Sequence, residues 1–255
     1  MRPTRVEIDL AAIAYNLQGI RKQVAPAGIM AVVKADAYGH GALQVSRLAL
    51  EEGAEYLAVA VADEAVALRK AGINAPILVF GVFSHEDARL FVDWELDATV
   101  FDRQGLALIS QAARKRNRPV RVHVKADTGM GRLGVDFREA VPFIEMVRNT
   151  EGVELVGLYT HFATSDALDK SYANLQLLRY KSLIDELASK GIRFRCWDSC
   201  GFGQFTLHTS GHNPREVQSQ RWRQRIMHKF SYQPDQLQVT GCVGCGRCSR
   251  ACPVD

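Results

Sequence analysis

One lysine in the sequence stands where its amine would be chemically useful. Residues 31–41 read Ala-Val-Val-Lys-Ala-Asp-Ala-Tyr-Gly-His-Gly, and Lys34 closes an apolar run that begins at Met30. Burial disfavours the charged form of a lysine, so a position at the end of a buried strand lowers its pKa. The neutral amine attacks aldehydes, which is the chemistry of a Schiff-base lysine. The alternative is that the side chain of Lys34 extends from the strand end back to water.

Two more polar groups follow predicted strands further along the chain. Lys125 ends an apolar strand and is followed by a glycine-rich loop that contains Arg132. His161 follows the next strand. The carboxyl ends of parallel strands meet at one edge of a sheet, so we expect these side chains to share a rim with Lys34.

Each of these three residues also has a simpler role that the sequence leaves open. Arg132 could pair with Asp127 or Asp136 in its own loop. His161 could be a hydrogen-bonded histidine without a ligand, and Lys125 could be a solvated strand end. Only the combination of the three with Lys34 favours a site.

The positions of the apolar residues predict alternating strands and helices. Segments rich in Val, Leu and Ala alternate with helices of period 3.6, a pattern typical of βα units around a parallel sheet. The expected strands are 6–10, 30–35, 56–61, 76–81, 97–101, 120–126 and 154–160. The first expected helix ends near residue 24. The others span 42–53, 62–71, 85–94, 103–116, 138–149 and 171–190.

Counting from residue 30 gives about six βα units and the start of a seventh strand at 192–194, whereas a closed (β/α)8 barrel has eight units. We therefore predict an α/β fold of the TIM-barrel type that is incomplete by about two units. A small, irregular, cysteine-rich segment is expected to follow it.

Composition divides the chain near residues 192–195. Residues 194–255 carry a net charge of +4 and all six cysteines, whereas residues 1–193 are neutral and have none. We predict two units of separate origin, 1–193 and 194–255. No apolar run approaches the roughly 18 residues of a membrane-spanning helix, and the N-terminus lacks the apolar core of a signal peptide. A cytoplasmic protein without a membrane segment is expected.

Three motifs resemble those of alanine racemases. They are Val-Val-Lys-Ala-Asp-Ala-Tyr-Gly-His-Gly (32–41), Lys-Ala-Asp-Thr-Gly-Met-Gly-Arg-Leu-Gly (125–134) and Leu-Tyr-Thr-His-Phe-Ala (158–163). The resemblance covers residues 1–193 in the family's order and spacing. It implies a pyridoxal-phosphate enzyme that interconverts L- and D-alanine and supplies D-alanine for peptidoglycan. It also implies a barrel domain, a C-terminal β domain and an active site shared across a homodimer.

The resemblance also implies a role for each matching residue. Lys34 would form the internal aldimine and act as the base on one face of the substrate, and Tyr38 would contact the cofactor phosphate. Arg132 would lie near the phenolic oxygen of the cofactor and the substrate carboxylate. His161 would support the pyridine ring. Lys125 matches a lysine that is carbamylated in some members, where it orients the arginine.

Racemisation explains why such residues are needed. Pyridoxal phosphate is the electron sink, and the protein supplies orientation and proton transfer. A proton must leave one face of the substrate and return on the other, so two bases are required. The family's second base is a tyrosine of the C-terminal domain, and residues 194–255 do not resemble that domain. The family's Asn-Ser pair, its pyridine-binding arginine and its second phosphate loop also have no counterpart. We therefore expect impaired racemisation, and the sequence leaves the homodimer open.

An iron–sulfur motif lies near the end of the sequence. The spacing Cys-x2-Cys-x2-Cys-x3-Cys-Pro of the bacterial ferredoxins, which bind [4Fe–4S] clusters, is formed by Cys242, Cys245, Cys248 and Cys252. Zinc binding or free thiols are the alternatives. In two-cluster proteins the fourth cysteine ligates the other cluster, so the fourth ligand stays open here.

Two further segments are Arg-Cys-Trp-Asp-Ser-Cys-Gly-Phe-Gly-Gln-Phe-Thr-Leu-His-Thr-Ser-Gly-His-Asn-Pro-Arg (195–215) and Arg-Trp-Arg-Gln-Arg-Ile-Met-His-Lys-Phe (221–230). With them, residues 195–255 resemble an iron–sulfur electron-transfer subunit of anaerobic sulfite reductases and nickel–iron hydrogenases. That resemblance implies a redox partner subunit. The basic residues between 221 and 229 are expected to lie on a solvated face rather than to bind nucleic acid. Three accounts follow: an alanine racemase by descent, an electron-transfer module, or a chimera of two truncated genes in which neither activity survives.

Overall fold

The computed structural model describes residues 6–192 and 195–197 and divides the chain into two compact units. One unit, Asp9–Thr164 with Lys170–Gly201, holds every helix and strand that the structure describes. The other comprises Met1–Ile8, Ser165–Asp169 and Phe202–Asp255, and its described residues form turns and irregular segments. No helix among the described residues is long and apolar enough to cross a membrane.

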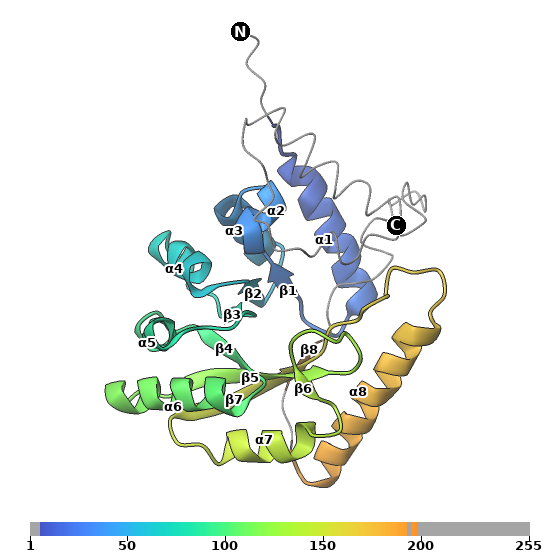
Figure 1. The fold of residues 1–255 in the computed structure, drawn as a ribbon. Helices are drawn as coiled ribbons and strands as arrows, with labels where there is room; N and C mark the ends of the chain where they lie inside the picture. The colour runs from blue at the N-terminus through green and yellow to red at the C-terminus, as the bar shows by residue number, and fades with distance from the viewer. Residues whose placement is uncertain (1–5, 193–194, 198–255) are drawn as a thin grey trace, which may run out of the picture. The chain divides into compact units, whose positions relative to one another are not determined.

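A parallel sheet forms the centre of the larger unit (Figure 1). Its strands follow the order β1-β2-β3-β4-β5-β7-β8, so β1 and β8 are the two ends of the path. The strands are β1 (Met30–Val32), β2 (Tyr56–Val59), β3 (Ile77–Val79), β4 (Asp97–Val100), β5 (Val120–Asp127), β7 (Val153–Tyr159) and β8 (Arg195–Trp197). The short β6 (Val135–Asp136) pairs with β5 off this path. The incomplete TIM-barrel type predicted from the sequence is therefore confirmed.

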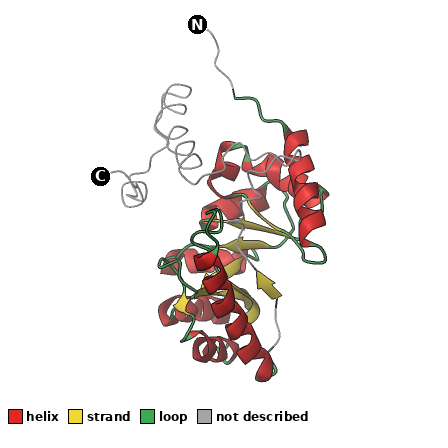
Figure 2. Ribbon diagram, turned by 90° about the vertical axis from the view of Figure 1, so that its right-hand side faces the viewer, coloured by secondary structure: helices red, strands yellow, loops and turns green. Residues whose placement is uncertain are grey.

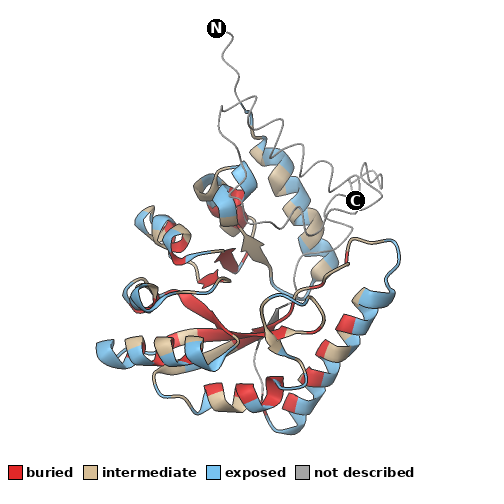
Figure 3. Cartoon of the chain, viewed as in Figure 1, coloured by how far each residue is buried: buried red, intermediate tan, exposed pale blue. Residues whose placement is uncertain are grey.

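Apart from α1, which precedes β1 and packs against α3, the helices follow the strands in turn and lie outside the curved sheet (Figures 1 and 2). They are α1 (Leu10–Val24), α2 (Lys34–Gly39), α3 (Ala42–Glu51), α4 (Ala62–Lys70), α5 (His85–Asp93), α6 (Arg103–Arg116), α7 (Ala140–Arg148) and α8 (Ser171–Ser189). The sides of α4 to α8 that face the strands carry the buried residues (Figure 3). The βα alternation predicted from apolar periodicity holds from β1 to β8.

Alternate residues of the strands face opposite sides of the sheet, as the period of two requires. Leu57, Val59 and Ile77 pack with the helices in the large outer core. Tyr56 and Ala58 belong instead to a small second cluster, which also contains Leu78 and Tyr159. This second cluster lines the inner face of the sheet.

The first and last predicted strands are wrong. Residues 6–9 form no strand, because the Asp9 side chain accepts the Ala12 N–H at 3.1 Å and so caps α1 from Leu10 onward. The seventh strand of the path lies at Arg195–Trp197 instead of 192–194. Ile192 closes the preceding helix instead, since its N–H donates to the Leu187 carbonyl at 2.9 Å.

A buried polar cluster on the inner face joins β2, β4 and β5 and lies beside Gly157 of β7. His123 Nε2 lies 3.0 Å from Asp97 Oδ2, which also accepts the Tyr56 hydroxyl at 3.0 Å. His123 pairs across the sheet with Gly157, immediately after a shift of register. A Cβ on residue 157 would lie 2.1 Å from His123 Nδ1, so glycine is needed there to admit the imidazole.

We predict that Gly157→Ala destabilises the fold by about 3 kcal/mol, because the new methyl group overpacks the histidine pocket. In a His123→Ala background the same substitution should cost less than about 1 kcal/mol, since the imidazole is gone and the two sites are in direct contact. Denaturant unfolding of the two single variants and the double variant measures this coupling. If Gly157→Ala destabilised the wild type and the His123→Ala variant equally, the proposed clash with the imidazole would be contradicted.

Candidate active site

Lys34 begins a turn and does not end the first strand. β1 stops at Val32, Val33 is buried, and Lys34 is the first residue of α2. Ala35–Tyr38 all have positive φ values between 51° and 58°, so the chain turns in the left-handed sense directly after the lysine. The prediction that the strand extends to residue 35 is therefore wrong, although the lysine still follows the carboxyl end of β1.

The left-handed turn brings two predicted cofactor-binding side chains together. Lys34 Nζ lies 5.9 Å from the centre of the Tyr38 ring. Left-handed conformations cost non-glycine residues roughly 1–2 kcal/mol each, so surrounding contacts must hold them. One such contact joins Asp36 Oδ1 to the Ala42 N–H at 2.6 Å, where Gly39, His40 and Gly41 lead into α3.

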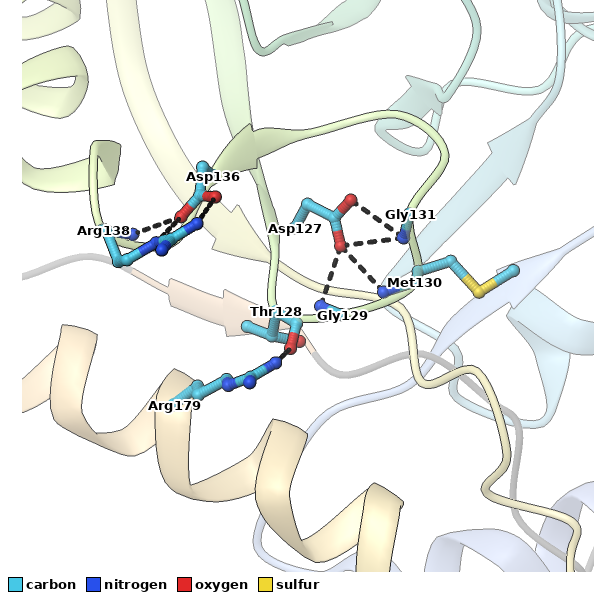
Figure 4. A network of polar contacts seen from close by, with 8 residues as sticks. All are labelled: Asp127, Thr128, Gly129, Met130, Gly131, Asp136, Arg138 and Arg179. Atoms are coloured by element: carbon cyan, nitrogen blue, oxygen red, sulfur yellow. Dashed lines mark hydrogen bonds and ion pairs between the residues drawn. The ribbon is translucent and has the colours of Figure 1, made fainter.

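The loop that carries Arg132 is organised by one carboxylate (Figure 4). Asp127 Oδ1 accepts the N–H groups of Gly129 and Met130, each at 2.8 Å. Its Oδ2 accepts the Gly131 N–H at 2.9 Å. Three successive backbone donors therefore point at one side chain, which fixes the path of the loop just before Arg132.

Helix α8 supports this loop and the loop after β7 at the same time. Arg179 Nη1 donates to the Thr128 carbonyl at 2.8 Å (Figure 4). Gln176 is fully buried, and its amide donates to Thr128 Oγ1 at 3.2 Å and to the His161 carbonyl at 3.1 Å. Gln176, which no motif of the sequence singles out, ties the strand ends that carry Lys125 and His161 to a single helix.

The ion pairs that the sequence offered Arg132 are not formed in the described part of the chain. Asp127 accepts backbone N–H groups, and Asp136 lies 2.6 Å from Arg138 (Figure 4). Hydrogen bonds from Arg138 hold the pKa of Asp136 well below its usual range. Arg132, which is exposed, therefore keeps its charge available at the rim.

Lys125 is buried and poorly suited to carry a charge. Its side chain is on the inner face at the end of β5, only 4% exposed, so the solvated strand end is ruled out. Burial lowers the pKa of Lys125 to about 8, and the charges of Arg132 and Lys34 act in the same direction. Its Nζ lies 5.6 Å from the centre of the Tyr159 ring, whose hydroxyl is 3.0 Å from Thr99 Oγ1.

His161 is neutral at pH 7. Its pKa is lowered to about 4, mainly by burial, and the charges of Lys125, Arg132 and Lys34 act in the same direction. The same four residues thus affect one another electrostatically from three strand ends. The structure brings together the predicted set of Lys34, Lys125, Arg132 and His161. Such a rim can bind an anion and hold a carbonyl against an amine.

The parallel strands alternate with helices, and these side chains lie at the carboxyl rim of the sheet. This arrangement defines a TIM-barrel-type enzyme domain. The sequence matches the family described as "Alanine racemase, N-terminal domain" over residues 8–213, which is well over half of the chain. The chain belongs to the alanine racemase family.

Curated relatives agree with this assignment. The chain is 41% identical over 194 residues to "Alanine racemase 2" of Caldanaerobacter subterraneus, which covers 75% of this chain and 50% of that protein. It is 42% identical over 192 residues to "Alanine racemase" of Methanococcus maripaludis, covering 74% and 52%. The chain therefore spans about half the length of the curated relatives that it matches.

Solved structures agree in fold. An alanine racemase of Clostridium difficile 630 matches with a TM-score of 0.76 and 32% identity, over 86% of this chain and 65% of that one. Alanine racemase from Bacillus anthracis, solved with bound L-Ala-P, matches with a TM-score of 0.71 and 35% identity, over 78% and 52%.

A second family matches the end of the sequence. Residues 179–255 match the family described as "4Fe-4S dicluster domain", in agreement with the predicted iron–sulfur segment. The predicted ligands Cys242, Cys245, Cys248 and Cys252 lie outside the described residues. Within the residues that are described, no group of His, Cys, Asp or Glu side chains is arranged to hold a metal ion.

We predict that Lys125 makes stability depend on pH. Its folded pKa of about 8 lies below the usual 10.5, so between these values the unfolded chain binds more protons. Stability must then rise with pH in that window, by up to about 1.4 kcal/mol per pH unit. Below pH 8 the folded chain bears the full free-energy cost of burying a charged Lys125.

Denaturant unfolding at several pH values tests this, with Lys125→Met as the variant and Lys115→Met, an exposed lysine of α6, as the control. We expect Lys125→Met to be more stable than the wild type at pH 7, with an advantage that shrinks from about pH 8 to pH 10.5. A constant difference across this range would show that Lys125 is solvated.

Proposed function

We propose that the described unit binds pyridoxal phosphate through Lys34 and provides one half of an alanine racemase active site. The convergence of Lys34 with Lys125, Arg132 and His161 at one rim carries this proposal. The donor set suits the cofactor: an amine for its aldehyde, cations for its anionic groups and a neutral imidazole for its ring.

Each residue has a task that its surroundings favour. When bound, pyridoxal phosphate supplies the electron sink that makes the Cα–H of an amino acid acidic. Lys34 binds the cofactor covalently and moves the proton on one face. Tyr38, on the same turn, contacts the phosphate. His161 is half-buried among cations, which keeps it neutral, so it would lie against the ring without adding a positive charge.

Arg132 binds the anionic groups, and Lys125 orients it. A guanidinium binds a carboxylate through two parallel hydrogen bonds, which suits the substrate. With a pKa of about 8, a fraction of Lys125 is neutral near physiological pH, and only a neutral amine can be carbamylated. A carbamate at Lys125 would turn a repelling charge into a partner for Arg132. The relatives that carry the name alanine racemase support alanine as the substrate.

Turnover by this chain is expected to be slow. Racemisation needs a base on each face, and the resemblance assigns only the Lys34 side within residues 1–193. We place the protein in the cytoplasm. Its oligomeric state in solution decides whether it forms the family's homodimer. The boundary between the racemase unit and the cysteine-rich segment is proposed to lie near residues 192–195.

We expect the purified chain to develop visible absorption when it is incubated with pyridoxal phosphate, because the cofactor becomes conjugated to Lys34. Lys34→Ala should abolish this absorption, whereas Lys22→Ala, an exposed lysine of α1, should retain it. Racemisation of L-alanine, followed by chirality, should be far slower than for a full-length relative. An unchanged spectrum in Lys34→Ala would reject the cofactor proposal.

A second function is favoured by an independent observation, the match of residues 179–255 to an iron–sulfur family. Two [4Fe–4S] clusters need about eight cysteine ligands, and the chain has six. We therefore propose that the cysteine run binds one cluster and transfers electrons to a partner subunit.

Anaerobic reconstitution should yield about four iron and four sulfide ions per chain. Cys245→Ala should lose them, and Cys196→Ala, outside the run, should not. Iron without sulfide, or zinc in its place, would contradict the cluster. Failure of both the cofactor and the cluster experiments would favour the third account, two joined partial sequences without either activity.

A further inference from the structure

The left-handed turn after Lys34 is held from outside by a helix. Five successive residues, Ala35–Gly39, have positive φ values, and four of them are not glycine. Such a conformation persists only where neighbouring groups fix it. The first N–H of this turn belongs to Ala35, the residue that follows the lysine, and the group that receives it therefore controls where the turn begins.

Glu64 of α4 receives that N–H. Its Oε1 accepts the Ala35 N–H at 2.6 Å, and its Oε2 accepts the N–H groups of Ala60 at 2.7 Å and Val61 at 3.3 Å. One carboxylate thus joins the turn after β1 to the loop after β2. Both oxygens act as acceptors, which a carboxylate can do and a glutamine amide cannot, because its NH₂ group would face an N–H donor.

The helix that carries Glu64 is itself well anchored. The neighbouring residues Ala62, Ala65 and Leu68 are buried against the sheet, with exposed fractions of 6% or less. Glu64 therefore transmits the position of a packed helix to the turn. Its contacts are to backbone, so it acts on Lys34 and Tyr38 through the path of the chain.

We propose that Glu64 is a positioning residue for Lys34: its carboxylate holds the left-handed turn that directs the lysine amine to the rim. The proposal rests on the proposed cofactor-binding function of Lys34. It adds a residue of α4 that the motifs of the sequence did not single out.

The experiment compares Glu64→Gln and Glu64→Ala with Asp63→Asn in the full chain. Asp63 is exposed, precedes Glu64 on the same first turn, and loses the same unit of charge in its variant. The rate of amide hydrogen exchange at Ala35 measures how strongly the Ala35 N–H is protected by its hydrogen bond to Glu64. Titration with pyridoxal phosphate, read by visible absorption and repeated across pH, measures the consequence for Lys34.

We expect exchange at Ala35 to accelerate about tenfold or more in both Glu64 variants. The dissociation constant for pyridoxal phosphate should rise about tenfold, and the pH dependence of the visible absorption should shift. Asp63→Asn should match the wild type in all three. A purely structural role would lower the unfolding midpoint without moving the pH dependence. Should Glu64→Ala fail to fold, Glu64→Gln decides the matter.

Two failures can be told apart. If the wild type binds no pyridoxal phosphate, the proposed function fails, and unchanged exchange at Ala35 in Glu64→Gln would then overturn the inference as well. If the wild type binds the cofactor and both Glu64 variants bind it equally well with the same pH dependence, the inference alone is overturned.

Discussion

The charges of Lys34, Lys125 and Arg132 repel one another at the carboxyl rim of the sheet, and the site depends on this repulsion. It lowers the pKa values of Lys125 and His161 beyond what burial does alone. An empty rim of this kind is electrostatically unfavourable, whereas an anionic ligand relieves it. Together with burial, the surplus of positive charge keeps His161 neutral and leaves part of the Lys125 amine uncharged, and it favours an anionic ligand.

Holding such a rim together requires rigid supports, and the structure supplies them through carboxylates and one amide. Asp127 collects the N–H groups of its own loop, and Glu64 joins two loops through three backbone donors. Gln176 connects the ends of β5 and β7 from within α8. These polar supports bond backbone groups and, for Gln176, also the Thr128 hydroxyl, so they fix the chain without neutralising the cations that face the ligand.

Much of this could be predicted from the sequence, and the exceptions have physical causes. Apolar periodicity predicts the βα units, and the polar residues at or just after the strand ends indicate Lys125 and His161. Periodicity could not reveal the left-handed turn, because its alanines carry no signature of positive φ. The apolar residues around Asp9 predict a strand, and their pattern does not distinguish it from the N-cap of a helix. Gln176 lies in line with Tyr180, Leu183 and Leu187, and a polar residue on that buried stripe was the signal available.

The central claim is that Lys34, which is partly exposed, bonds the cofactor and that the buried Lys125 does not. Borohydride reduction of the chain saturated with pyridoxal phosphate, followed by mass mapping of its peptides, tests this directly. The account predicts a phosphopyridoxyl group on Lys34 in place of an even distribution over surface lysines. Labelling of Lys125 in preference to Lys34, or of exposed lysines alone, would contradict it.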